Sequence, residues 1–167
     1  MATNRALARK LRRIKMLLLD VDGVMTDAGL YYSANGVEMK RFNAHDGYGV
    51  VRAREQGLKI GIVTGRSTPI VDARAKDLNV EELFQGSTDK ITAMKEILRR
   101  HALAPQEIAF VGDDLFDIPL LQSVGFSAAP RNARPEVKRI VDYVTRVKGG
   151  DGAVREIIDL ILKHRQP

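Results

Sequence analysis

The chain of 167 residues has no cysteine and no tryptophan, and aromatic residues make up only 5% of it. The lack of cysteine excludes disulfide bonds and thiolate metal sites, and it is compatible with a reducing compartment. No apolar run approaches the roughly 20 residues that cross a bilayer, and residues 1–5 lack the apolar core of a signal peptide. We therefore expect a cytoplasmic protein with no membrane partner. Apolar residues make up 44% of the chain, so we expect one core and a single domain over residues 1–167.

The formal net charge of +6 is confined to the start of the chain. Residues 1–15 contain no acid and six basic residues, namely Arg5, Arg9, Lys10, Arg12, Arg13 and Lys15. Removing these six from the 27 basic residues leaves 21, which equals the number of acids. Leu7, Leu11 and Ile14 recur at helical spacing, so we expect residues 1–14 to form a basic helix that covers one edge of the domain. An arm for nucleic acid or an anionic membrane is the alternative, but no aromatic residues are interleaved, and we expect no nucleic-acid partner.

Apolar runs of strand length alternate with helical patterns along most of the chain. Strands are expected at residues 16–20, 59–64, 83–85, 108–112, 126–129 and 143–145. Helices are expected to begin at Thr68-Pro69, at Ser87 or Thr88, between Asn132 and Pro135, and near Gly152. Strands separated by helices form βαβ units, so the pattern predicts an α/β fold with a doubly wound, mainly parallel, Rossmann-like sheet.

Two carboxylates follow the first of these strands with one residue between them. Asp20 and Asp22 can leave the strand toward the same side, because side chains in a strand alternate with a period of two. Burying two like charges together is unfavourable unless a cation or a proton compensates them. The pair therefore indicates a metal, a catalytic proton, or both.

The other strands are also followed by groups suited to a cation or to phosphate. These are Thr64-Gly65-Arg66, Gly112-Asp113-Asp114, Asp117 and Lys90. In a parallel sheet such groups gather at the carboxyl ends of the strands. The acids suit a hard divalent ion, whereas the hydroxyl, ammonium and guanidinium suit an anion. One carboxylate can attack phosphorus to give an aspartyl-phosphate, and a second can move the proton, so the set indicates phosphoryl transfer.

Residues 28–43 interrupt the alternation of strands and helices. The stretch from Leu30 to Phe42 predicts a β-hairpin with Asn35-Gly36 as its two-residue turn. Because it leaves the first strand just after the carboxylate pair, we expect it to stand over the site as a flap. A hairpin alone is marginally stable in water, so a partner subunit or the substrate is expected to cover its apolar residues; an ordinary surface hairpin is the alternative. Those residues are Tyr31, Tyr32, Val37, Met39 and Phe42.

The ordered motifs resemble those of the haloacid dehalogenase-like phosphatases. They are Asp20-Val21-Asp22-Gly23-Val24, Thr64, Lys90 and Gly112-Asp113-Asp114. The resemblance implies that Asp20 is the nucleophile and Asp22 the general acid/base. It also implies that Thr64 and Lys90 hold the phosphate.

The same resemblance implies a magnesium ion as the cofactor. Its ligands would be the carboxylates of Asp20 and Asp113 and the backbone carbonyl of Asp22. Asp114 and Asp117 would lie behind these ligands or serve as alternative ones.

Within that superfamily the chain is similar to the 3-deoxy-D-manno-octulosonate 8-phosphate phosphatases. The similarity rests on the small size, the early hairpin, Phe42-Asn43 before Asp46-Gly47-Tyr48-Gly49, and the stretch from Thr145 to Gly150. It implies a fold with no large cap domain and a homotetramer in which one subunit's hairpin helps to close its neighbour's active site. The implied reaction is magnesium-dependent hydrolysis of the octulosonate phosphate in lipopolysaccharide biosynthesis.

Substrate selection depends on cations beyond Lys90, because the implied substrate carries a carboxylate as well as a phosphate. Gly65, Arg66 and Arg74 are the candidates, with a solvated helix face as the alternative for Arg74. A phosphatase for another acidic sugar, such as a nine-carbon keto-deoxy acid, is the enzymatic alternative. A receiver-like signalling domain and a metal-binding relative without turnover are the non-enzymatic ones. Ala28 stands where the family usually has glycine, and His45 is expected on a loop.

Overall fold

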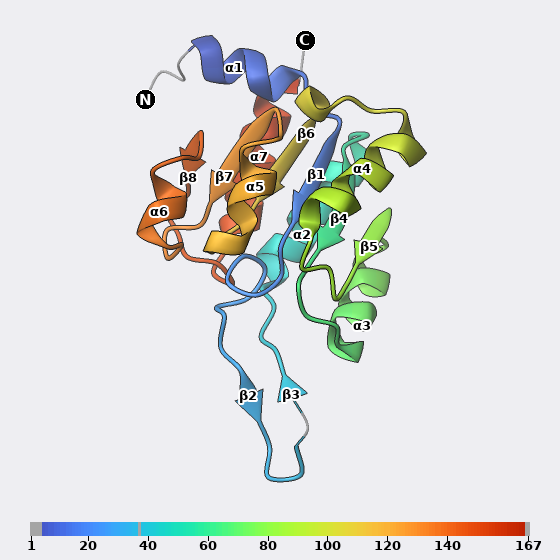
Figure 1. The fold of residues 1–167 in the computed structure, drawn as a ribbon, viewed down its shortest axis with the longest axis vertical. Helices are drawn as coiled ribbons and strands as arrows, with labels where there is room; N and C mark the ends of the chain where they lie inside the picture. Colours follow the sequence, from blue (N-terminus) through green and yellow to red (C-terminus); the bar gives the residue numbers. More distant parts are fainter. Residues whose placement is uncertain (1–4, 37, 166–167) are drawn as a thin grey trace.

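The computed structural model describes residues 5–36 and 38–165 of the chain (Figure 1). Its centre is a six-stranded sheet in the order β5-β4-β1-β6-β7-β8, and every neighbouring pair is parallel. The strands are β1 (Met16–Leu19), β4 (Lys59–Val63), β5 (Glu82–Phe84), β6 (Ile108–Val111), β7 (Phe126–Ala129) and β8 (Tyr143–Val144). The predicted doubly wound parallel sheet is therefore confirmed. No helix of the described ranges is both long and apolar enough to cross a bilayer.

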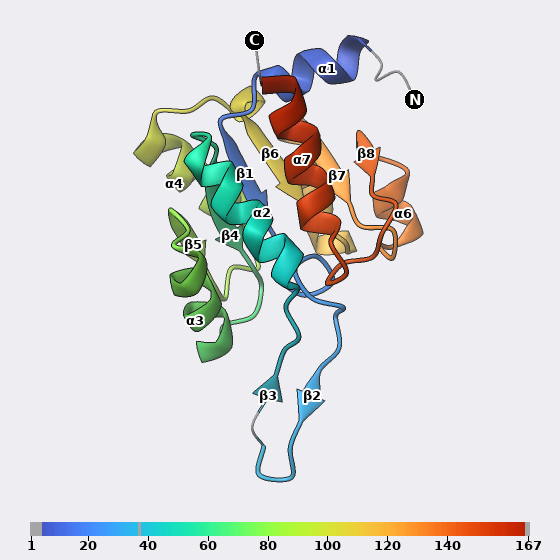
Figure 2. The ribbon, with the colours of Figure 1, turned by 180° about the vertical axis from the view of Figure 1, so that it is seen from behind.

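Helices cover both faces of this sheet. They are α1 (Arg5–Arg12), α2 (Ala44–Glu55), α3 (Pro69–Leu78), α4 (Lys90–His101), α5 (Ile118–Leu121), α6 (Pro135–Lys138) and α7 (Ala153–Arg165), with short 3₁₀ turns η1 (Pro105–Glu107) and η2 (Leu115–Asp117). Leu17 and Leu19 of β1 join the core formed with α2, α3 and α7. Figure 2 shows α2 and α7 in front of the sheet on this face. Met16 and Leu18 point to the other face and pack with α4, α5 and α6. The all-apolar strand thus supplies both cores, as a central parallel strand must.

The helix starts follow ordinary capping chemistry. Thr68 caps α3 as predicted, since its side chain accepts a hydrogen bond from the Val71 N–H and Pro69 occupies the first helical position. The prediction for the next helix is wrong by one or two residues. Asp89, rather than Ser87 or Thr88, caps α4, because its carboxylate accepts hydrogen bonds from two backbone N–H groups of the first turn.

The sequence did not predict α2, and His45 lies in its first turn rather than on a loop. Glycine lowers helix propensity, and α2 contains two. Both are explained by packing. A Cβ on Gly49 would lie 2.8 Å from the Arg155 side chain of α7, and one on Gly47 would lie 2.6 Å from the Arg74 side chain of α3. The glycines therefore let α2 approach its neighbours closely.

The hairpin projects beyond the carboxyl end of the sheet, away from α1 (Figures 1 and 2). Its strands β2 (Tyr31–Tyr32) and β3 (Glu38–Met39) pair antiparallel. The turn is closed by the Gly36 N–H, which donates to the Ser33 carbonyl, so Ala34 and Asn35 are its central residues. The predicted Asn35-Gly36 centre is wrong, because Gly36, with φ +80°, follows the turn as its left-handed residue.

Apolar side chains of the hairpin are only partly covered by the chain itself. Tyr31, Tyr32 and Met39 are 45%, 60% and 56% exposed, whereas Phe42 packs against the main core. Val37 lies outside the described residues. At the opposite pole α1 packs against α7 and buries Leu11; residues 1–4 of the expected basic helix also lie outside the described residues.

Candidate active site

A cavity of about 450 Å³ opens where β1, β4 and β6 end side by side. Its lining residues are Asp20, Asp22, Ala28, Thr64, Gly65, Arg66, Thr88, Asp113, Asp114 and Phe116. The polar residues that follow each strand thus meet at one edge, as the parallel topology requires.

A buried lysine links two of the acids at the base of this cavity. The Lys90 Nζ lies 3.0 Å from Asp20 Oδ2 and donates a hydrogen bond of 2.6 Å to Asp117 Oδ1. All three side chains are at most 2% exposed. The Phe116 ring, with its centroid 4.7 Å from the same ammonium, adds a cation–π contact. Lys90 is therefore held at a fixed place beside the Asp20 carboxylate.

Asp117 holds both Lys90 and the loop that follows β6. Its Oδ2 accepts hydrogen bonds from the backbone N–H groups of Asp113 (2.9 Å) and Asp114 (3.3 Å). Gly112 makes this possible, since a Cβ there would lie 2.6 Å from the Asp117 side chain. With both oxygens engaged, Asp117 positions its neighbours.

The acids outnumber the cations at the base of the cavity. Asp20, Asp113 and Asp117 each offer an oxygen, and these atoms lie within 4.8 Å of one another. Burial raises the pKa of Asp20 to about 6, although Lys90 opposes the shift. Burial, reinforced by the charges of Asp20 and Asp117, raises the pKa of Asp113 to about 8. A cluster of hard oxygen donors with uncompensated negative charge is the donor set that a magnesium ion fits.

The backbone after β1 is shaped around this cluster. Gly23 has φ +84°, and a Cβ there would lie 2.0 Å from Asp113 Oδ2. Gly149 packs so closely that its Cβ would lie 1.8 Å from the Gly23 carbonyl oxygen, and the Gly150 N–H donates to the Val24 carbonyl. The glycine loop before α7 therefore supports the loop that carries Asp22.

Asp22 stands nearer the mouth of the cavity and faces the hairpin. Its carboxylate forms an ion pair with Lys40, whose side chain is completely buried, and lies 3.9 Å from Arg66 Nε. Lys40 Nζ also lies 3.1 Å from Glu38 Oε1, and Arg66 Nη2 lies 2.9 Å from Glu38 Oε2. Sequence reasoning missed Lys40 and Glu38. Glu38 and Lys40 are two residues apart in the second arm of the hairpin, and this spacing puts both side chains on the same face. That spacing is the sequence feature from which both residues could have been predicted.

The chain resembles curated proteins over nearly its whole length. It is 44% identical over 153 residues to the 3-deoxy-D-manno-octulosonate 8-phosphate phosphatase of Escherichia coli K12, which covers 92% of this chain and 81% of the relative. The chain belongs to this phosphatase family. Residues 77–157 also match the haloacid dehalogenase-like hydrolase family, so the resemblance inferred from the motifs is confirmed.

Solved structures of the octulosonate phosphatase family share the fold. The Yersinia pestis phosphatase aligns with a TM-score of 0.94 at 40% identity, covering 96% of this chain and 87% of that one. The Moraxella catarrhalis phosphatase, solved with magnesium, phosphate and KDO, aligns with a TM-score of 0.93 at 36% identity, covering 95% and 91%.

Most of the site residues expected for an octulosonate phosphatase converge on the cavity, but Arg74 does not. Its guanidinium lies over the Phe42 ring at 5.3 Å and donates to Asp77 at 2.7 Å, away from the cavity lining. Asp114 lines the cavity, and its Oδ1 accepts a hydrogen bond from the Leu115 N–H at the start of η2. Gly65 leaves open space, since a Cβ there would meet nothing within 4 Å.

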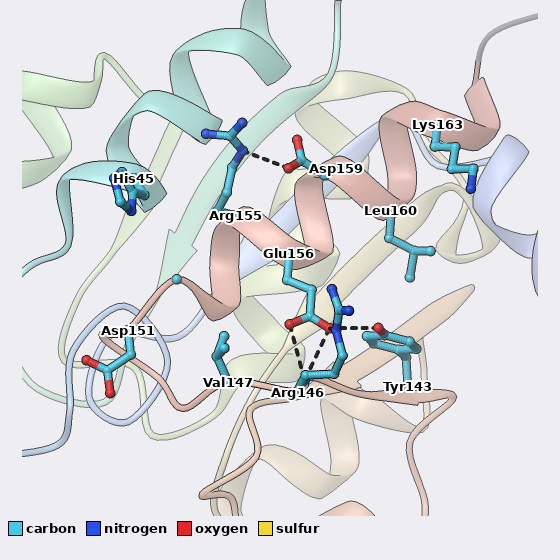
Figure 3. Close-up of a pocket in the computed structure, with 11 residues that line it drawn as sticks. His45, Tyr143, Arg146, Val147, Asp151, Arg155, Glu156, Asp159, Leu160 and Lys163 are labelled. Atoms are coloured by element: carbon cyan, nitrogen blue, oxygen red, sulfur yellow. Dashed lines mark hydrogen bonds and ion pairs between the residues drawn. The ribbon is translucent and has the colours of Figure 1, made fainter. Parts of the chain in front are cut away.

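A second cavity, of about 630 Å³, lies between α7 and the loop after β8 (Figure 3). Its charged side chains largely pair with one another. Arg155 binds Asp159 at 2.8 Å, and Glu156 accepts hydrogen bonds from the Tyr143 hydroxyl at 2.7 Å and the Arg146 N–H at 3.1 Å. The smaller cavity instead has an acid cluster that can bind a cation and the Lys90 ammonium beside Asp20, so it is the better candidate for catalysis.

Proposed function

We propose that this chain is a magnesium-dependent phosphatase that hydrolyses 3-deoxy-D-manno-octulosonate 8-phosphate to the free sugar acid and phosphate in lipopolysaccharide biosynthesis. The observation that carries the proposal is the buried Asp20–Lys90 pair at the end of β1 in a member of this family. The named activity of the Escherichia coli relative and the magnesium, phosphate and KDO of the Moraxella catarrhalis structure support the same substrate class.

Asp20 is the nucleophile in the proposed mechanism. One of its carboxylate oxygens attacks phosphorus, the bond to the sugar oxygen breaks, and an aspartyl-phosphate forms. Lys90 neutralises the phosphoryl oxygens, and the Thr64 hydroxyl donates to them. Burial raises the pKa of Asp20, but the adjacent Lys90 ammonium opposes that shift and so favours the ionised form that a nucleophile needs.

Asp22 moves the proton in both half-reactions. It donates a proton to the departing sugar oxygen, so the sugar leaves as an alcohol. It then takes a proton from the water that attacks phosphorus, and Asp20 and phosphate are released. The partly exposed side chain of Asp22 at the cavity mouth suits contact with the sugar and with water.

The carboxylates of Asp20 and Asp113 and the backbone carbonyl of Asp22 are the proposed magnesium ligands. When bound, the ion neutralises and aligns the phosphoryl group. Asp114 and Asp117 support this set, since Asp117 already binds Lys90 and two backbone N–H groups.

Arg66 is the proposed partner of the substrate carboxylate, and Gly65 leaves room for the sugar beside it. The role of Arg74 in substrate binding stays a prediction. So do the homotetramer, in which the exposed hairpin residues would find cover, and the cytoplasmic location. A nine-carbon keto-deoxy acid phosphate is the alternative substrate, because it presents the same two anionic groups.

Phosphate release from a panel of esters tests the proposal. With saturating magnesium, the wild-type chain is expected to prefer the eight-carbon acid over the nine-carbon acid and over hexose phosphates. Asp20→Asn should abolish release, whereas Asp151→Asn, a matched change of an exposed carboxylate, should not. Release that survives Asp20→Asn would refute the nucleophile. Preference for hexose phosphates would refute the substrate and leave the mechanism standing.

A further inference from the structure

One face of the hairpin is directed at the cavity and carries charge. Tyr32 and Glu38 are directly opposite each other in the β2–β3 pair, and Lys40 follows Glu38 by two residues, so the three side chains share a face. All three interact with groups at or near the cavity. The opposite face carries Tyr31 and Met39, neither of which lines the cavity.

Arg66 is engaged by this face. Its Nη2 donates to Glu38 Oε2 at 2.9 Å and to the Tyr32 hydroxyl at 3.4 Å. The Glu38 carboxylate therefore occupies the guanidinium that would otherwise bind an anionic group of a ligand. Arg66 also lines the cavity, so its guanidinium lies within reach of a molecule held there.

Glu38 has a second cationic partner. Lys40 Nζ lies 3.1 Å from its other oxygen, and this ammonium is completely buried between Glu38 and Asp22. If Arg66 turns away, Glu38 keeps the Lys40 contact, so no carboxylate is left buried without a counter-ion. Arg66 can thus exchange one carboxylate for another while Glu38 keeps its ion pair with Lys40.

We propose that Glu38 is a specificity-determining residue that occupies Arg66 as an internal carboxylate, which an acidic substrate displaces and a neutral sugar phosphate cannot. This inference rests on the proposed function, because it takes Arg66 as the partner of the substrate carboxylate. Asp22, Glu38, Lys40 and Arg66 carry two negative and two positive charges, so the substrate carboxylate enters a neutral cluster. Glu38 therefore competes with a substrate carboxylate for Arg66, whereas a neutral sugar phosphate brings no carboxylate to Arg66 and is not affected by this competition.

The test is the Michaelis constant of Glu38→Gln for two kinds of ester, the eight-carbon acid phosphate and a hexose phosphate. Gln removes one negative charge and leaves the cluster positive, so KM for the acidic ester should fall about fivefold, the scale of one partly exposed ion pair. KM for the hexose phosphate should not change. Glu38→Ala should shift the ratio of the two KM values in the same direction.

Glu96→Gln is the matched control, because Glu96 pairs with Arg99 and Arg100 on α4, away from the cavity lining. It should leave both KM values unchanged. A rise in KM for the acidic ester in Glu38→Gln would show that Glu38 merely orders Arg66 and would overturn the proposal. Equal changes for both esters would overturn it as well.

Failure of the substrate assignment gives a different result. If the substrate assignment is wrong, the wild-type chain itself will not hydrolyse the eight-carbon ester. The KM ratio would then be measured with whichever carboxylated ester the wild type hydrolyses. If it hydrolyses none, the Glu38 proposal is also wrong.

Discussion

Replacing Asp113 by asparagine should make the protein more stable and less active. The carboxyl group of Asp113 has its pKa raised from 3.8 to about 8, first by burial and then by the charges of Asp20 and Asp117. Because the folded chain binds this proton more tightly than the unfolded chain does, its contribution to stability is complete below pH 4 and is lost as the pH rises toward 8.

The size of the effect follows from the same shift. In the unfolded chain this carboxyl is ionised at pH 7, which lies about three units above its ordinary pKa. Each unit corresponds to about 1.4 kcal/mol. Asp113 thus lowers the free energy of unfolding by up to ~4 kcal/mol relative to low pH. Asparagine does not ionise. The free energy of unfolding of Asp113→Asn should therefore exceed that of the wild type by up to this amount at pH 7.5 and by little at pH 4.5.

Urea denaturation in the presence of a chelator, at both pH values, measures this difference. Adding magnesium should stabilise the wild type and have little effect on Asp113→Asn, since a ligand stabilises only the state that binds it. Asp151→Asn, an exposed carboxylate paired with Arg41, serves as the control and should stay within about 0.5 kcal/mol of the wild type. An Asp113→Asn variant no more stable than the wild type at pH 7.5 would refute the account of the acid cluster.

Three further substitutions test other parts of the structure. Lys90→Met should destabilise the protein by about 3 kcal/mol in urea denaturation, because it leaves Asp20 and Asp117 buried without their cation; a loss below about 1 kcal/mol would contradict this. Ala28→Gly should raise the melting temperature through a gain of about 1 kcal/mol, since Ala28 has φ +66°, and an unchanged temperature would show that no strain is relieved. Gly150→Ala should lower both the melting temperature and the phosphatase rate, because the new Cβ would lie 2.6 Å from the Asp27 backbone nitrogen. Wild-type values for both would show that this glycine does not support the loop after β1.

The sequence predicted the sheet and most of the convergence at its edge. The runs that form β1, β4 and β6 are short and apolar and are followed within two residues by a polar residue, and parallel strands place such residues together without further information. Asp20, Thr64 and Asp113 could therefore be placed in one site from order and spacing alone, and all three line the cavity.

The elements that escaped prediction depend on contacts between distant segments. Helix α2 contains two glycines that disfavour a helix locally, and only its packing against α3 and α7 explains them. Lys40 and Glu38 reach the site through ion pairs with Asp22, which follows β1, and with Arg66, which follows β4, and no local pattern specifies these contacts. Arg74 had helical spacing from Arg66, but Asp77 and Phe42 hold its guanidinium elsewhere.

The most direct test of the central claim is to trap the covalent intermediate. Borohydride reduces an acyl phosphate to an alcohol, so adding it during turnover with magnesium and the eight-carbon ester should modify the Asp20 carboxyl. Mass spectrometry of the tryptic peptide 16–40 would locate the change and separate Asp20 from Asp22 and Asp27 in the same peptide. We expect reduction at Asp20 that requires substrate. Turnover with no reduced Asp20, or with the label on another residue, would contradict the account.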